Sequence, residues 1–548
     1  MSAAGKLENG SVEKREGVDL DYILVNEIGQ FDKYQIVTLL LASLPIIFSA
    51  FAAGEYIFTT ARIPSRCLIP QCDGANPQFA PFWILEAVPG DSLASFEQCR
   101  RYADSPDQRP PAPGTCPAFL FNASLTQDCD RGYVYQHTDT IVYDFDIACD
   151  EWRRTQIGSI RTIGTLLVLP ITGYISDRWG RRVALVINAF NTGWLGLVRS
   201  FVNSYEWFMA LEVMESAVGA GAYSSCYILV TELVGPKYRV LVGATISTFF
   251  ALGQVILGLI AWGVHPWRTL TQVLYAPQLL VISYFWILSE SVRWLMSKGQ
   301  YEKAEVILKK VAKVNNKELS EKSLEALRST VEAEKLIERP KEPWLPLLVI
   351  RSKVILSRCC VSPIWWVTNT FIYYGMSINA VNLSGNGYLN YVYVAAIEIP
   401  GYWTAILLLD RIGRKPVLIS AYFLCAARIF CSSGMDGLSM AFYLVGKYSI
   451  AVVMTSVYVY TAELYPTKYR HSLFAFSSMV GRIGSITAPL TPALVKVWSG
   501  LPSVLFGSFA LISGLLIFTT PETLGTELPD TMEQAEQLEV VMTKFSVN

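Results

Sequence analysis

Charged residues are scarce in this sequence. Asp, Glu, Lys and Arg make up 17% of its 548 residues, whereas soluble proteins average about 25%. The formal net charge is −1, so no basic excess indicates nucleic-acid binding. Apolar residues make up 52% of the chain, and its mean hydropathy is +0.34. This composition argues against a soluble enzyme or a disordered scaffold, and it indicates a protein that crosses a membrane several times.

Histidines and catalytic motifs are scarce as well. The chain has three histidines, His137, His265 and His471, which lie far apart in the sequence. It contains no HExxH, no GxSxG, no phosphate-binding P-loop and no Cys/His spacing typical of a metal site. We therefore predict that the chain is not an enzyme, that it uses no cofactor or metal, and that ATP does not drive its activity.

Long hydrophobic runs, in contrast, are frequent. A helix needs about 20 apolar residues to cross a hydrocarbon core roughly 30 Å thick. Such stretches are predicted at 34–58, 152–176, 183–203, 206–234, 239–263, 267–289, 353–378, 387–409, 415–434, 437–462, 471–495 and 501–520. The predicted fold class is therefore an all-α membrane protein with twelve transmembrane helices.

Basic residues follow alternate predicted spans. They are Arg178, Arg181, Arg182, Lys237, Arg239, Arg411, Arg414, Lys415, Lys468 and Arg470. The loops between the other spans, such as 384–387, contain almost no cations. Because cytosolic loops are enriched in Lys and Arg, we expect a multi-pass plasma-membrane protein with both termini in the cytosol.

The connection between the first two spans, residues 59–150, falls outside the cell in this topology. It holds six cysteines: Cys67, Cys72, Cys99, Cys116, Cys129 and Cys149. An even number of cysteines in an oxidising compartment predicts three disulfides and leaves their pairing open. Asn122-Ala123-Ser124 in the same loop is a glycosylation acceptor sequence.

The predicted domain boundaries follow from the spans. They are a cytosolic tail (1–33), the first helix (34–58), the outer loop (59–150), the rest of a first six-helix half (151–289), a cytosolic helical linker (290–350), a second six-helix half (351–522) and a cytosolic tail (523–548). Charged helical stretches are expected within the linker at 301–313 and 320–338. Residues 1–30 and 525–548 are polar and acidic, and we expect them to be disordered.

The two halves repeat one another. Asp177-Arg178-Trp179-Gly180-Arg181-Arg182 recurs 233 positions later (410 − 177) as Asp410-Arg411-Ile412-Gly413-Arg414-Lys415. Glu232 and Arg239 recur 231 positions later (463 − 232 and 470 − 239) as Glu463 and Arg470. Transporters are commonly built from such repeats, with the substrate held where the repeats meet.

The first of these motifs, within GYISDRWGRR (173–182), resembles the signature loop of the major facilitator superfamily. The cysteine-rich loop and the segments TELVGPKYR (231–239), AELYPTKYR (462–470), SESVRWL (289–295) and PETLGTELPD (521–530) resemble the organic cation, anion and zwitterion transporter family. This resemblance covers nearly the whole chain. It implies a carrier of small organic ions in the lipid bilayer that alternates between outward- and inward-facing states.

Charges near the cytosolic ends of the spans are expected to form ion pairs that act as a gate, and the resemblance implies the same role. These candidates are Asp177, Arg178, Arg181, Glu232, Arg239, Asp410, Arg414, Glu463 and Arg470. Such pairs can act as a lock that forms in one state and breaks in the other. We do not expect them to select the substrate.

Charges deeper in the spans need a partner or a function, because burial in hydrocarbon is costly. They are Glu55, Arg161, Glu212, Glu215, Glu398, Lys447 and Arg482. Arg482 would attract a substrate carboxylate. The resemblance implies the same role for Arg482, because cation-selective members of the family carry an acidic residue at this position. A lysine at position 447 is similar to the carnitine-type branch of the family. Alternatively, Arg482 pairs with Glu398 or Glu55 and does not contact the substrate.

An amine needs a different receptor. By resemblance the cavity is lined by Tyr223, Phe250, Trp366, Tyr373, Tyr374, Met454, Thr455 and Tyr458. Aromatic faces attract ammonium groups by roughly 0.5–2 kcal/mol each. Glu398 is a candidate counter-charge, and Glu55 is a second one or else binds a coupling ion, sodium or a proton.

These residues favour a carrier of amine-bearing zwitterions similar to carnitine, carcinine or β-alanine. Three alternatives stay open: a polyspecific organic cation carrier, an organic anion exchanger, and a receptor that does not transport.

Overall fold

The computed structural model describes residues 19–93, 95–105, 115–336, 344–431, 439–467, 469–495, 497–498, 500–525, 529 and 532–536. Most of both predicted tails, part of the linker and Lys468 therefore lie outside the described residues.

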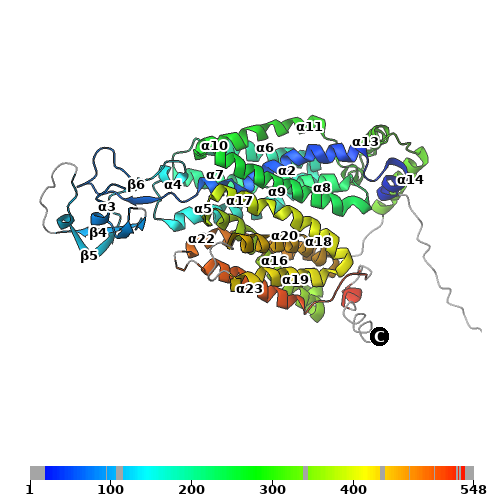
Figure 1. Ribbon diagram of the computed structural model, residues 1–548. Helices are drawn as coiled ribbons and strands as arrows, with labels where there is room; N and C mark the ends of the chain where they lie inside the picture. The colour runs from blue at the N-terminus through cyan, green and yellow to red at the C-terminus, as the bar shows by residue number, and fades with distance from the viewer. Residues whose placement is uncertain are drawn as a thin grey trace, which may run out of the picture.

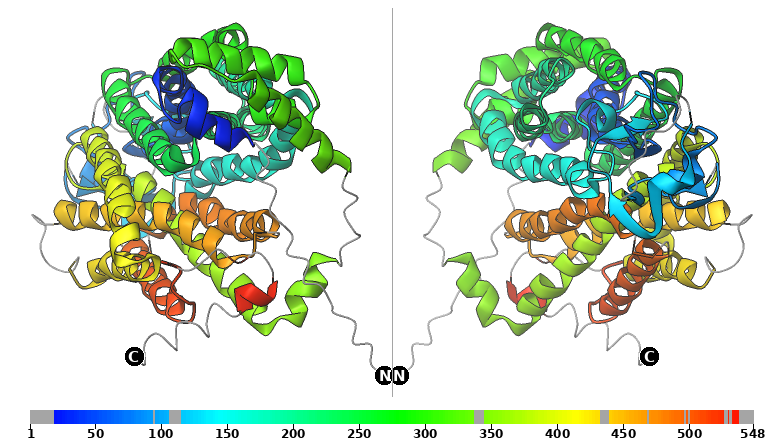
Figure 2. Two further views of the ribbon diagram at one scale, coloured as in Figure 1. Left: turned by 90° about the vertical axis from the view of Figure 1, so that its right-hand side faces the viewer. Right: turned by 90° about the vertical axis from the view of Figure 1, so that its left-hand side faces the viewer.

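Two bundles of helices lie side by side along the long axis of the molecule (Figures 1 and 2). The first half comprises α2 (Lys33–Thr59), α5 (Glu151–Trp179), α6 (Arg181–Arg199), α7 (Tyr205–Gly219), α8 (Ala222–Glu232), α9 (Arg239–Gly263), α10 (Trp267–Tyr275), η4 (Ala276–Ser283) and α11 (Tyr284–Ile287). The second comprises α16 (Lys353–Asn379), α17 (Gly387–Ala396), α18 (Glu398–Ile412), α19 (Arg414–Cys431), α20 (Ser439–Leu464), α21 (Arg470–Thr487), η6 (Ala488–Leu490), α22 (Thr491–Leu494) and α23 (Leu501–Ile517).

Each predicted span coincides with one helix or with consecutive helical segments. Within the described residues, 7 helices are long and apolar enough to cross a membrane, and Leu501–Ile517 is a shorter apolar helix. Several spans are broken where the sequence requires it. Gly221 lies in the break between α7 and α8, where a Cβ atom would stand 2.1 Å from Thr172 Oγ1. Pro277 lies in the 3₁₀ segment η4, and proline lacks the backbone donor that an α-helix needs.

The described residues between 60 and 150 form a small domain at one end of the bundle (Figure 1), which we call the loop end. Its antiparallel strand pairs are β1 (Ser65–Cys67) with β6 (Tyr133–Tyr135), β2 (Gly90–Ser92) with β3 (Ser95–Phe96), and β4 (Arg100–Asp104) with β5 (Phe121–Asp128). Its short helices are α3 (Ile84–Ala87), η2 (Ala118–Leu120) and α4 (Ile141–Asp144).

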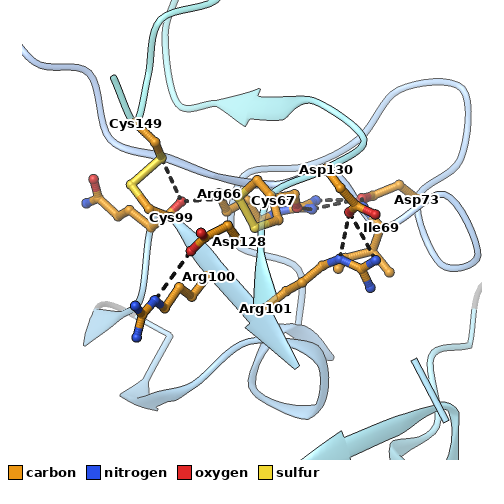
Figure 3. The surroundings of a disulfide bond; sticks show 12 residues. Arg66, Cys67, Ile69, Asp73, Cys99, Arg100, Arg101, Asp128, Asp130 and Cys149 are labelled. Atoms are coloured by element: carbon orange, nitrogen blue, oxygen red, sulfur yellow. Dashed lines mark hydrogen bonds and ion pairs between the residues drawn. A yellow bond between two sulfur atoms is a disulfide. The ribbon is translucent and has the colours of Figure 1, made fainter. Parts of the chain in front are cut away.

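The prediction of three disulfides in this domain is confirmed. The pairs are Cys67–Cys129, Cys72–Cys116 and Cys99–Cys149, and Figure 3 shows the last of these. Asn122 lies on β5, and its glycosylation stays a prediction.

Two buried arginines stabilise the loop-end domain (Figure 3). Arg66 is fully buried, pairs with Asp73 at 2.6 Å and stacks over the Trp83 ring. Arg101 is 1% exposed and binds Asp104 and Asp130 at 2.7 and 3.1 Å. Although partial burial raises the pKa of Asp130, its hydrogen bond and charge interaction with Arg101 outweigh this effect and hold the pKa below the ordinary value.

The opposite end, which we call the linker end, carries α12 (Val292–Ser297), α13 (Tyr301–Val314), α14 (Glu321–Leu336) and α15 (Leu345–Arg351). The prediction of helices at 301–313 and 320–338 is confirmed for the described residues. The expectation of a disordered first tail is wrong for residues 19–30, since α1 (Leu20–Ile23) and the π-helical turn η1 (Leu24–Ile28) pack their apolar side chains against the linker helices. Asp21 holds this segment through Arg239, at 2.7 Å, and Arg293.

The halves are in contact toward the loop end. Ser159 on α5 donates a hydrogen bond to the Ile486 carbonyl on α21 at 2.9 Å, and the Phe58 ring stacks on Tyr388 at 5.6 Å. These contacts join the two halves at the loop end.

Candidate functional site

Aromatic side chains from both halves meet at the middle of this interface. Tyr223 on α8 packs edge-on against Phe250 on α9, with ring centroids 5.5 Å apart. From the second half, Tyr374 on α16 and Tyr458 on α20 are close enough to Tyr223 to interact electrostatically. All four are partly exposed. The structure thus brings together residues from four helices that the sequence nominated separately.

Arg482 on α21 belongs to the same group. Its side chain is half-buried and interacts electrostatically with Tyr458. Among the described residues Arg482 has no ion-pair partner, whereas Glu55 pairs with Arg199 and Glu398 pairs with Lys447. The alternative in which Arg482 pairs with Glu55 or Glu398 is therefore not the arrangement in this state.

Lys447 requires a correction. Its ammonium lies 2.8 Å from Glu398 Oε1, and both side chains are 0% exposed. The ammonium also donates to the Tyr373 carbonyl at 2.9 Å and to Ser377 Oγ at 2.7 Å. A lysine in the membrane interior needs such partners. Neither Lys447 nor Glu398 therefore offers surface to a ligand in this state, and the expectation that both face the substrate is wrong here.

Two of the predicted aromatic residues are buried behind this aromatic group. Trp366 is 1% exposed, packs on Tyr458 with centroids 4.7 Å apart and donates to Thr461 Oγ1 at 3.1 Å. Tyr373 is 3% exposed, and its hydroxyl donates to Glu398 Oε2 at 2.6 Å. These two residues pack behind Tyr458 and Tyr374, respectively.

Met454 and Thr455, on the same helix as Tyr458, are partly exposed. The Asn369 amide donates to the Met454 sulfur at 2.9 Å, and Thr455 Oγ1 is 3.5 Å from the Ala451 carbonyl. These two predicted residues remain available at the edge of the aromatic group.

Sequence reasoning missed a link across the interface. Gln254 on α9 is 6% exposed and lies 3.5 Å from the hydroxyls of both Tyr373 and Tyr391. It connects the first half to the Glu398–Lys447 pair through Tyr373. A buried glutamine within an apolar span is the signal that would have identified it.

A second buried charge cluster lies within the first half. Arg199 contacts Glu55 Oε2 at 2.9 Å and Glu212 and Glu215 at 2.6 Å each. Arg161 binds Glu212 at 2.5 Å and Glu215 at 2.7 Å. Sequence reasoning named four of these five residues but missed Arg199, although it lies inside a predicted span as Arg161 does.

The repeated motifs form matching structures at the linker end. Arg181 pairs with Asp177 at 2.9 Å and Glu232 at 3.5 Å, and Arg414 pairs with Asp410 and Glu463 at 3.0 Å each. Every one of these pairs lies within a single half. They are ion pairs, as expected, and in this state they do not join the halves.

Of the other gate candidates, Arg178 donates to the Tyr174 hydroxyl at 2.8 Å. Arg239 binds Asp21, and Arg470 donates to Thr467 Oγ1 at 3.1 Å.

Two carboxylates that sequence reasoning left without a role complete the motifs. Glu290 accepts hydrogen bonds from the backbone N–H groups of Arg181 and Arg182 at 2.9 and 3.1 Å. Glu522 accepts them from Arg414 and Lys415 at 3.0 and 2.9 Å. Each carboxylate binds the positive end of a helix. Their spacing of 232 positions (522 − 290) matches the internal repeat and could have identified them.

Comparison with known proteins agrees with this architecture. Residues 121–534 match the family model described as sugar (and other) transporter. The human organic cation/carnitine transporter 2 is 30% identical over 526 residues, with 92% of each chain covered. The organic cation transporter protein of Drosophila melanogaster is 29% identical over 525 residues, with 94% of each chain covered.

Among solved structures, the chain resembles the xylose transporter XylE from E. coli in a partially occluded inward open conformation. The TM-score is 0.58 at 16% identity, covering 90% of this chain and 100% of that one. This similarity supports the fold of two helical halves. The chain belongs to the sugar (and other) transporter family of the major facilitator superfamily, within the organic cation and carnitine transporters of solute carrier family 22.

Proposed function

We propose that this protein carries small amine-bearing zwitterions, similar to carnitine, carcinine or β-alanine, across the plasma membrane. The observation that carries the proposal is Arg482, which is half-buried beside Tyr458 and has no ion-pair partner among the described residues. A guanidinium inside a membrane protein costs several kcal/mol unless an anion neutralises it. A substrate carboxylate would supply that anion and can bind a guanidinium through two hydrogen bonds.

The other end of the substrate would meet the aromatic wall. Tyr223, Phe250, Tyr374 and Tyr458 lie close together at the interface of the halves, and each ring would contribute about 0.5–2 kcal/mol toward an ammonium group. A zwitterion whose charges are a few bonds apart would bind both groups at once. Lys447 and Glu398 compensate each other and would shape the site without binding the substrate.

We infer that the chain crosses the membrane twelve times, with both termini in the cytosol. Transport would occur by alternating access, in which the site opens to one side of the membrane and then to the other. The linker end would then be cytosolic and the loop end external, which agrees with disulfides in the loop-end domain. The contacts that close the loop end, Ser159 with Ile486 and Phe58 with Tyr388, would make this an inward-facing state. These contacts would separate as the protein turns outward.

The ion pairs of Arg181 and Arg414 are proposed to hold the cytosolic ends of each half rigid while the halves rock. Because they lie within one half, a lock between halves would require a change of partner in the outward-facing state. Neither ion pair would select the substrate.

Competition uptake in proteoliposomes tests the substrate class. Radiolabelled carnitine and β-alanine uptake should fall at least tenfold in Arg482→Ala and recover in part in Arg482→Lys. The matched control is Arg328→Ala, since Arg328 is a 63% exposed linker arginine. If permanent cations without a carboxylate are carried as well as zwitterions and Arg482→Asp changes nothing, the chain is a polyspecific cation carrier. Strong stimulation of uptake by dicarboxylates on the opposite side of the membrane would indicate an anion exchanger. Binding of the substrate without uptake would indicate a receptor that does not transport.

A further inference from the structure

The charge cluster in the first half is not electrically balanced. Its three carboxylates, Glu55, Glu212 and Glu215, face two guanidiniums, Arg161 and Arg199, and no side chain among the five is more than 9% exposed. With every group ionised the cluster would hold one uncompensated negative charge inside the protein. A buried charge without compensation costs several kcal/mol, so a bound cation or a proton would stabilise this state.

A metal cation does not fit the arrangement. Such an ion needs several oxygens that converge on one point, and no group of three or more His, Cys, Asp or Glu side chains within the described residues could hold a metal. The guanidinium of Arg199 lies between the carboxylates instead, in contact with all three. A proton needs only one carboxylate oxygen and a hydrogen-bond acceptor.

Glu55 is the carboxylate with least positive charge around it. Glu212 and Glu215 each contact both arginines, whereas Glu55 contacts Arg199 alone. Its other oxygen, Oε1, lies 2.7 Å from Thr271 Oγ1.

Hydrogen counting at the Thr271 hydroxyl favours Glu55 Oε1 as the position of such a proton. Thr271 Oγ1 lies 2.7 Å from Glu55 Oε1 and 2.8 Å from the Trp267 carbonyl, and both neighbours are acceptors if Glu55 is ionised. A hydroxyl has one hydrogen and can donate fully to only one of them. If Glu55 carries a proton, the carboxyl donates to Thr271, Thr271 donates to Trp267, and both contacts are hydrogen bonds.

The remaining groups around Glu55 come from several helices. The Tyr275 hydroxyl on α10 contacts Glu215 at 3.1 Å and Arg199 at 3.3 Å, and so remains inside the network. The helices α8 and α9 also pack on α2, but their charged residues, Glu232 and Arg239, have partners at the linker end.

We propose that Glu55 is a proton-binding site of this carrier, occupied in the state described. The adjacent Tyr56 and, one turn further, Thr60 line a cavity of about 110 Å³ between the halves at the loop end, so a proton from outside has a short path when that end opens. Protonation would neutralise the cluster and favour closure of the loop end. Only the coupling of this proton to substrate movement rests on the proposed function.

Infrared spectroscopy of the purified full-length protein tests the site without any substrate. At neutral pH the wild type should show the carbonyl band of a protonated carboxyl, and Glu55→Gln should remove it. Thr271→Val, which keeps the side-chain shape, should shift the band without abolishing it, and so provides a test if Glu55→Gln does not fold. Glu206→Gln is the control, because Glu206 is a carboxylate at the exposed start of α7. The absence of the band in the wild type would overturn the proposal. A band that persists in Glu55→Gln but is lost in Glu212→Gln would overturn it as well, because the proton would then lie on Glu212.

Uptake into proteoliposomes tests the coupling. With the membrane voltage clamped, an inward proton gradient should stimulate carnitine or β-alanine uptake, a sodium gradient should not, and Glu55→Gln should lose the response. Stimulation by sodium alone, or by neither gradient, would overturn proton coupling. If none of these substrates is carried but the carboxyl band behaves as described, the proposed substrate class fails while the proton site stands.

Discussion

The Lys447 ammonium lies 2.8 Å from the Glu398 carboxylate, and neither side chain has exposed surface. The ammonium also lies 3.8 Å above the centre of the Tyr373 ring, and Tyr373 contacts Gln254 in the other half. The pair therefore anchors α16, the helix that carries Tyr373 and Tyr374, and connects it to the interface between the halves. We propose that it contributes to function by positioning these two tyrosines.

Removing one member of this pair should destabilise the protein more than removing both. Lys447→Met or Glu398→Gln alone leaves a buried group without its partner, and we expect a loss of about 3–5 kcal/mol. The double variant should recover most of that loss. Melting temperatures of the four proteins in detergent measure the coupling, and additive losses would show that the two side chains do not interact.

Charge reversal at Arg482 should change which substrates are carried. Arg482→Asp places a carboxylate beside the tyrosines, so uptake of permanent organic cations should rise while zwitterion uptake falls at least tenfold, equivalent to about 1.4 kcal/mol or more. The variant should melt close to the wild type, because Arg482 has no ion-pair partner among the described residues. An unchanged substrate profile would remove Arg482 from the binding site.

Substitution of Gly413 should weaken the start of α19. Gly413 has φ +113, and a Cβ atom there would lie 2.6 Å from Glu522 Oε2. We expect Gly413→Ala to cost about 1–3 kcal/mol, measured by thermal unfolding. Gly173→Ala is the matched control, since a Cβ atom at Gly173 meets nothing within 4 Å, and it should be neutral or slightly stabilising. Equal effects of the two changes would contradict the assigned role of Gly413.

The Cys99–Cys149 disulfide should stabilise the loop-end domain. It closes a loop with a sequence separation of 50, and its removal in Cys99→Ser/Cys149→Ser should cost about 2–5 kcal/mol. Limited proteolysis of the folded full-length protein should then cleave residues 60–150 faster. Cys360→Ser, which alters an exposed free cysteine, should leave the cleavage rate unchanged, and protection in the double serine variant would refute the prediction.

The loop-end domain should also lose some stability in acid. Arg101 lowers the folded-state pKa of Asp130 below its ordinary value of 3.8, so the stabilisation is complete above that value and is lost as the pH falls through the lowered pKa. Asp130 is 54% exposed, so the effect should be below about 1 kcal/mol. Proteolysis at acidic pH by an acid-active protease measures it, with Asp130→Asn expected to remove this part of the pH dependence.

Local patterns in the sequence determined much of this protein. Runs of about 20 apolar residues have to form helices in a membrane because each backbone group must be hydrogen-bonded internally, and every predicted span holds helices. The repeated motifs around Asp177 and Asp410 predicted two similar halves, and six cysteines predicted three disulfides. These features depend on residues close in sequence or on counts, so they can be inferred without coordinates.

Only the tertiary structure decided which charges pair and which remain available to a ligand. Lys447 and Arg482 are both cations within apolar spans, yet Lys447 is neutralised by Glu398 from another helix, whereas Arg482 has no ion-pair partner in the part of the chain that the structure describes. Arg199 likewise joins Glu55 and Glu215 across 144 and 16 positions. Ion pairing depends on separations of a few ångströms between side chains, and helix packing sets those separations, so residue type and sequence spacing alone do not determine them.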